Sequence, residues 1–127
     1  MRSTVAHRRC AALIVSAATL AACAAETDPP PQVRGGDVER GRTALIRHEC
    51  GVCHVIPGIP SAVGRVGPAL DEYAQRPYIA GKFPNQPDVL GRWIVDAPAM
   101  AHQTAMPAIA MSQQEARDAA AYLYEPD

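Results

Sequence analysis

Cys50, Cys53 and His54 lie within five consecutive positions, in the stretch ECGVCHVIPG. Two thiols three residues apart, followed at once by an imidazole, can bind a metal ion, cycle a disulfide or hold a haem. Each use requires a different fold from a chain of 127 residues, which is long enough for one domain. The remaining residues decide among them.

The first 22 residues have the pattern of an export signal. A basic start precedes the apolar run CAALIVSAATL, which is too short to span a bilayer and suits the apolar region of a signal peptide. The run ends in LAAC, which resembles the lipobox of bacterial lipoproteins; in that family the chain is cut before the cysteine, which is then acylated. We predict a lipoprotein-type signal peptide at 1–22 and a lipidated Cys23, with an ordinary signal peptide cut at a nearby small residue as the alternative.

Export would leave an acidic chain with few cysteines. Removing Arg2, Arg8 and Arg9 leaves 9 basic against 13 acidic residues, a net charge of −4, and the basic residues form no run of the kind that binds nucleic acid. We expect residues 23–36, rich in Pro and Gly, to form an extended tether, and residues 37–127 to form the folded domain. The two cysteines left in that domain would face an oxidising compartment, which favours a disulfide or another covalent bond at these thiols.

Three segments have the apolar periodicity and the terminal residues of helices, and no alternating strand pattern appears. We expect helices over residues 37–49, 87–97 and 112–124, separated by long loops rich in Pro and Gly. Their starts are marked by Asp37 as an N-cap, by Pro87 in a first turn, and by a capping box of Ser112 and Glu115. Their predicted apolar stripes are Val38, Leu45 and Ile46; Val89, Leu90, Trp93, Ile94 and Ala97; and Ala116, Ala119, Ala120 and Leu123.

The size of the domain favours a large apolar cofactor. Long loops in so small a domain are unusual unless they wrap around something. A small hydrophobic core also needs an additional source of stability. Cys50, Cys53 and His54 match the c-type haem attachment pattern, in which two thiols add to two vinyl groups and the imidazole binds the iron. We therefore predict one covalently bound haem c.

The other two uses fit the sequence less well. A zinc site needs four ligands, and the domain has no second cysteine pair; His48 or His102 could join a mixed site, but their spacing matches no compact zinc motif. A redox dithiol of the thioredoxin type needs a strand followed by a helix, which the pattern lacks.

A sixth iron ligand is expected from the loop before the last helix. Met106, in TAMP, is followed by a proline that keeps the chain extended, so its thioether can reach the far face of the haem. His102 is the competing ligand and would give a bis-histidine iron of lower potential. We expect Met100 and Met111 to fill the core and His48 to face solvent.

In order and spacing, GDVERGRTALIRHECGVCH, VGPALDEYAQRPYIAG, LGRWIVDAP, TAMP and EARDAAAYLY resemble the class I c-type cytochromes. The resemblance covers residues 36–124, and it is strongest to a bacterial subgroup with CHxIPG and RWI segments. It implies an all-α fold, the small cytochrome c fold, with three or more helices wrapped around the haem.

The resemblance also implies roles for single residues. The Pro68 carbonyl would accept the His54 N–H, Arg76 would pair with a haem propionate, and Trp93 would shield the haem near Met106. Tyr78 and Asn85 are weaker propionate candidates. The resemblance further places Gly41 and Leu45 of the first helix against Ala119 and Tyr122 of the last. Lys82 is the only lysine, so the ring of lysines by which this family docks to partners is missing.

The expected function is one-electron transfer by a His/Met-ligated haem, without enzymatic activity. Expected partners are a quinol-oxidising complex or dehydrogenase as donor and a terminal oxidase or reductase as acceptor, reached by a periplasmic domain anchored to a membrane, on the outer side of the cytoplasmic membrane. Two alternatives stay open. One is a haem enzyme or gas sensor with a labile sixth ligand, and the other is a fixed cytochrome subunit of a terminal oxidase complex.

Overall fold

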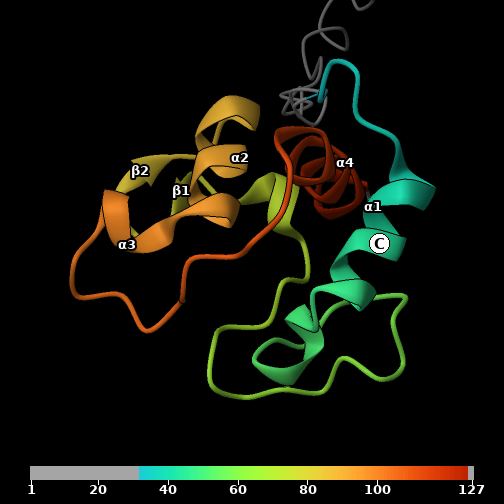
Figure 1. Cartoon of the computed structure of the whole chain (residues 1–127), viewed down its shortest axis with the longest axis horizontal. Helices are drawn as coiled ribbons and strands as arrows, with labels where there is room; N and C mark the ends of the chain where they lie inside the picture. Colours follow the sequence, from blue (N-terminus) through green and yellow to red (C-terminus); the bar gives the residue numbers. More distant parts are fainter. Residues whose placement is uncertain (1–31, 126–127) are drawn as a thin grey trace, which may run out of the picture.

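The computed structural model describes residues 32–125. In this part of the chain, α1 (Val38–Arg47) and α4 (Gln113–Tyr124) lie side by side, as Figure 1 shows. Helix α2 (Pro87–Val95) packs against α4, and the one-turn α3 (Ala97–Met100) follows α2. The predicted signal peptide, Cys23 and the first part of the predicted tether lie outside the described residues. Within 32–125, no helix has both the length and the apolar character needed to cross a membrane.

The expected helix starts are confirmed. Asp37 caps α1 by accepting a hydrogen bond from the Arg40 N–H, and Pro87 stands in the first turn of α2. Ser112 and Glu115 form the capping box of α4, with the Ser112 N–H donating to Glu115 Oε2 at 2.7 Å. The stripes predicted for α2 and α4 are buried, whereas Ile46 of the α1 stripe is exposed.

Gly41 lies where α1 crosses α4. A Cβ atom there would fall 2.6 Å from the Asp118 carbonyl carbon and 3.0 Å from Cβ of Tyr122. Because no side chain separates them, the two backbones approach closely, and Leu45 and Ala119 are buried in the same core. The packing of the first helix against the last is therefore confirmed.

Asp118 ties the start of α1 to α4. Its side chain is 3 % exposed and accepts hydrogen bonds from the Asp37 N–H at 2.9 Å, from Arg40 Nε at 2.8 Å and from Gln114 Nε2 at 2.9 Å. The Arg40 hydrogen bond is the main reason that the pKa of the Asp118 carboxyl is lowered from its usual 3.8. The ionised carboxylate is therefore part of the native packing.

Asp118 should make the stability of the domain sensitive to acid. Because its pKa is lower in the folded state, ionisation of Asp118 stabilises the fold above the unfolded value, and this contribution is lost as the pH falls through the folded pKa. Urea unfolding of the wild type is expected to show a steeper loss of stability below about pH 4 than unfolding of Asp118→Asn, which cannot titrate. Equal acid slopes in the two proteins would contradict this assignment.

Three local features differ from expectation. His48 does not face solvent: its side chain is 16 % exposed and Nε2 lies 3.3 Å from Glu115 Oε1, which also pairs with Arg47. The loop after α2 contains α3, because Asp96 caps it through the Ala99 N–H and Pro98 is tolerated in a first turn. Two two-residue strands, β1 (Tyr78–Ile79) and β2 (Phe83–Pro84), pair antiparallel, so the fold is helical with one short hairpin.

Candidate functional site

The Cys50–His54 segment follows α1 as a short 3-10 turn, η1 (Cys50–Val52). The His54 N–H donates to the Cys50 carbonyl at 3.0 Å, which closes the turn. The following loop holds it from the other side, because the Gly64 N–H donates to the Gly51 carbonyl at 3.0 Å and the Gly67 N–H to the Cys53 carbonyl at 2.8 Å. Both thiols therefore sit on a backbone fixed by its own hydrogen bonds.

The orientation of His54 is fixed by the same loop. Its Nδ1 lies 2.7 Å from the Pro68 carbonyl oxygen, the contact that the resemblance implies. A carbonyl can only accept, so Nδ1 carries a proton, and the tautomer that leaves the lone pair on Nε2 is the one this contact favours. A Cβ atom on Gly67 would lie 2.7 Å from Nδ1 and 2.9 Å from Nε2, so the glycine leaves room for the ring. The arrangement leaves Nε2 as the ring nitrogen that can bind a metal.

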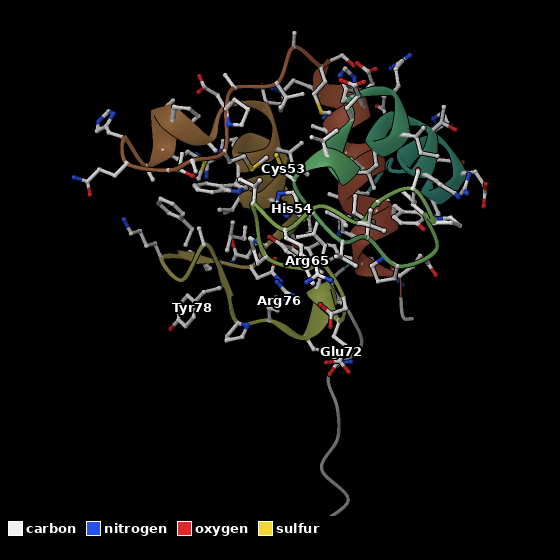
Figure 2. The ribbon with its side chains drawn as sticks, turned by 90° about the horizontal axis from the view of Figure 1, so that it is seen from below. Cys53, His54, Arg65, Glu72, Arg76 and Tyr78 are labelled. Atoms are coloured by element: carbon white, nitrogen blue, oxygen red, sulfur yellow. The ribbon has the colours of Figure 1, made fainter. Side chains whose placement is uncertain are left out.

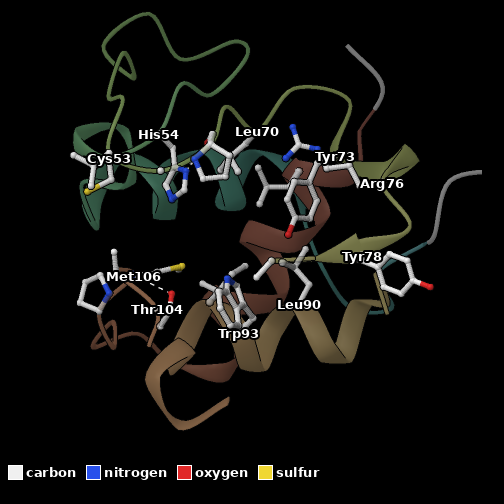
Figure 3. Close-up of a pocket in the computed structure, with 18 residues that line it drawn as sticks. Cys53, His54, Leu70, Tyr73, Arg76, Tyr78, Leu90, Trp93, Thr104 and Met106 are labelled. Atoms are coloured by element: carbon white, nitrogen blue, oxygen red, sulfur yellow. Dashed lines mark hydrogen bonds between the residues drawn. The ribbon is translucent and has the colours of Figure 1, made fainter. Parts of the chain in front are cut away.

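Met106 comes from the loop between α3 and α4. The Met106 N–H donates to Thr104 Oγ1 at 3.2 Å, and beyond it the Ile109 N–H donates to the Val95 carbonyl at 2.9 Å. The loop is thereby tied to the C-terminal end of α2. Figure 3 shows Met106 on one wall of a cavity and His54 on the opposite wall.

The cavity between these walls has a volume of about 310 Å³ and is mainly apolar. Cys53 lies at one end of it, and Tyr73, Arg76 and Tyr78 lie at the other (Figure 3). Leu90 and Trp93 of α2 form part of the Met106 wall, and Ile94 of the same helix also lines the cavity. Its other lining residues are Val66, Gly67, Pro68, Leu70, Ala80, Thr104, Ala105, Pro107 and Leu123.

Of the predicted site residues, Cys53, His54, Pro68, Arg76, Trp93 and Met106 line this cavity. Cys50 is half-buried and packs against the core beside it. Three other candidates do not line the cavity: His102 is exposed, and Met100 and Met111 pack against the core, as expected for core methionines.

Arg76 and Asn85 are engaged by the protein. Arg76 Nη2 donates to the carbonyls of Ala69 and Asp71 at 2.7 and 2.8 Å, and to Asp71 Oδ1 at 3.1 Å. Asn85 Nδ2 donates to the Tyr73 and Arg76 carbonyls at 2.8 and 2.9 Å, while its Oδ1 accepts from the Tyr124 hydroxyl. Asn85 does not line the cavity, and its amide, which is satisfied within the protein, holds the chain around Tyr73.

The two thiols are free in the structure. Burial raises the pKa of the Cys50 thiol, whereas reactive dithiols have a lowered pKa at one cysteine. In the described part of the chain, no three side chains of His, Cys, Asp or Glu come together in a metal-binding cluster. The geometry therefore favours the third use of these residues, the attachment of a haem.

The sequence profile of the cytochrome c family matches residues 38–125, which include every cavity-lining residue. The chain belongs to the cytochrome c family. The resemblance to class I c-type cytochromes is thereby confirmed, and with it a small helical cytochrome domain. Members of this family bind haem c covalently and generally carry electrons.

A similar protein is the cytochrome c oxidase subunit 2 of Alkalihalophilus pseudofirmus, which is 30% identical over 100 residues. The alignment covers 78% of this cytochrome and 28% of the subunit, so this cytochrome spans less than a third of that protein.

The residues around the cavity fit haem c. Cys53 lies at one end, with Cys50 three residues before it in the same turn; His54 lies on one wall, and the Met106 thioether stands on the opposite wall. The walls between them are lined mainly by apolar side chains, which suit a porphyrin ring. Cys50, Cys53, His54 and Met106 are thus the residues that would hold the cofactor.

Proposed function

We propose that this cytochrome is a one-electron carrier with a single haem c, attached through Cys50 and Cys53 and ligated by His54 and Met106. The observation that carries the proposal is the cavity itself, with an imidazole oriented by Pro68 on one wall and a thioether on the other. When bound, the haem supplies an iron that gains or loses one electron without a change of ligands.

The chain's own residues prepare the site for this exchange. Pro68 keeps the proton of His54 on Nδ1 and makes the ring a better donor. The Thr104 hydroxyl holds the backbone at Met106, so the side chain is already positioned when the haem is attached. Leu90, Trp93 and Ile94 exclude water, and a dry site favours the less charged, reduced state.

We further propose an exported location with a lipid on Cys23, from the LAAC stretch and the apolar run before it. A multiply acylated terminus would hold the protein on a membrane, on the outer side of the cytoplasmic membrane. Residues 23–36 would let the domain reach neighbouring complexes, a quinol-oxidising complex or dehydrogenase as donor and a terminal oxidase or reductase as acceptor. Lys82 is the only lysine, so docking would depend on surfaces other than a lysine ring.

A second candidate is a fixed cytochrome subunit of a terminal oxidase complex. The similarity to an oxidase subunit 2 favours it, since in that protein the matching segment is part of a longer chain. Purification in mild detergent separates the two, because a fixed subunit remains with a membrane complex and a carrier does not.

Carbon monoxide tests the carrier directly. The reduced, haem-loaded protein is expected to bind little of it at neutral pH, because Met106 would already bind the iron. The same sample should contain one haem per chain by its alkaline pyridine spectrum. Prompt, stoichiometric binding of carbon monoxide would contradict the carrier and favour a haem enzyme or gas sensor.

A further inference from the structure

Tyr73 is a cavity residue that the sequence motifs do not single out. It begins the 3-10 turn η2 (Tyr73–Gln75), is 7 % exposed, and lines the cavity at the end opposite Cys53. Its ring packs against Tyr124, with centroids 6.3 Å apart, and lies 5.2 Å from the central carbon of the Arg76 guanidinium. The ring therefore contacts both a buried aromatic side chain and a cation.

The hydroxyl of Tyr73 has no hydrogen-bond partner within residues 32–125. The buried hydroxyl of Tyr124 donates to Asn85 at 2.8 Å, and that of Tyr122 donates to the Pro57 carbonyl at 2.6 Å. In the described residues, no fully enclosed polar side-chain atom lacks a partner, so the Tyr73 hydroxyl keeps accessible surface. Figure 3 shows its oxygen directed into the cavity, between the His54 wall and the Met106 wall.

Once a haem fills the cavity and excludes water, this donor requires an acceptor, because an unmade hydrogen bond at a buried site costs stability. The covalent structure of haem c decides which acceptor comes to this end. Its thioether links and its two carboxylates lie on opposite edges of the ring. With the links at the Cys50 and Cys53 end, the carboxylates come to the end that holds Tyr73 and Arg76.

We propose that the Tyr73 hydroxyl donates a hydrogen bond to a haem carboxylate and positions that edge of the cofactor. This inference rests on the proposed haem attachment. Arg76 helps to position the Tyr73 ring. Its guanidinium lies over that ring and is itself held in place, because its Nη2 donates to the carbonyls of Ala69 and Asp71. Burial raises the pKa of Tyr73 to about 12, so the phenol remains a donor at neutral pH.

The dependence of the midpoint potential on pH tests the proposal in the haem-loaded protein. A hydrogen bond to the ionised carboxylate lowers the pKa of that carboxylate. Tyr73→Phe is therefore expected to move the inflection in the plot of midpoint potential against pH to a higher pH, by about one unit. The potential at neutral pH should fall, because a carboxylate without its donor favours the oxidised iron more strongly. Tyr122→Phe is the matched control, because Tyr122 does not line the cavity and its hydroxyl donates to the Pro57 carbonyl, so this variant should retain the wild-type curve. Tyr78, the other tyrosine at this end of the cavity, is 56 % exposed and points away from the body of the molecule (Figure 2).

If Tyr73→Phe does not fold or does not acquire haem, a measurement on the wild type alone still tests the proposal. Proton NMR of the reduced protein should show cross-relaxation between the Tyr73 ring protons and a methylene of a haem carboxylate arm. An unchanged curve in a haem-loaded Tyr73→Phe variant, or Tyr73 contacts only to other parts of the ring, would overturn the proposal. A protein without haem would instead overturn the proposed function, so the two failures are distinguishable.

Discussion

Replacing Gly41 with alanine is expected to lower the free energy of unfolding by about 3 kcal/mol or more. The added methyl group would meet the backbone carbonyl of Asp118, with its carbon 2.6 Å away. A carbonyl inside α4 cannot rotate aside as a side chain can, so α1 and α4 must separate. That movement would also lengthen the hydrogen bonds from Arg40 to the Asp118 carboxylate. Urea unfolding of the haem-loaded protein, followed by circular dichroism, measures the loss.

Gly91→Ala is the matched control for this substitution. Gly91 also lies inside a helix, α2, and a Cβ atom there would have no neighbour within 4 Å. Since alanine is the better helix former by about 1 kcal/mol, this variant should be as stable as the wild type or more stable. Equal stability of the two variants would contradict the close crossing of α1 and α4.

Replacing Met106 with histidine is expected to lower the midpoint potential by on the order of 0.1 V or more, within the span of about 0.8 V that axial ligands control. A thioether favours the reduced iron, whereas a second imidazole favours the oxidised iron. The position, on the wall opposite His54, suits a ligand of either type. Potentiometric titration followed at the visible bands measures the shift.

The control for this variant is Met111→His. Met111 is half-buried, packs against the core and is not among the residues that line the cavity. Its replacement should leave the potential within a few hundredths of a volt of the wild type, a small part of the range set by ligand identity. A similar fall in both variants would show that the loss does not come from ligation at position 106.

Local sequence signals predicted the helices and one end of the cavity well. Asp37 and the Ser112–Glu115 pair fix helix starts through bonds between residues close in sequence, which a pattern can reveal. The Cys50–His54 spacing matches a specific covalent chemistry, so it pointed to the cavity before any geometry was known. The Pro68 contact spans 14 positions, and the family resemblance rather than the residue pattern indicated it.

The errors concern contacts between residues distant in sequence. His48 meets Glu115 across 67 positions, and nothing near either residue signals that they pair. The sequence likewise gives no signal that the Asn85 amide bonds to the Tyr73 and Arg76 carbonyls and to the Tyr124 hydroxyl. Strands of two residues are too short to show an alternating pattern.

Tyr73 illustrates a further limit of prediction from the sequence. The sequence around a loop tyrosine does not indicate whether its hydroxyl faces solvent, bonds to the backbone or enters a cavity. Only the three-dimensional structure shows that the ring packs against Tyr124 and Arg76 and that its hydroxyl is directed into the cavity. The signal that could have indicated it was its position three residues before Arg76, itself a cofactor candidate.

Iron ligation by Met106 is tested most directly by the far-red absorbance of the oxidised protein. A sulfur–iron bond gives a weak charge-transfer band in that region, and the wild type is expected to show it together with a strong Soret band. Met106→Ala is expected to keep the Soret band, because Cys50, Cys53 and His54 are unchanged, and to lose the far-red band. A far-red band that persists in Met106→Ala, or a purified wild type with no Soret absorbance, would contradict the account.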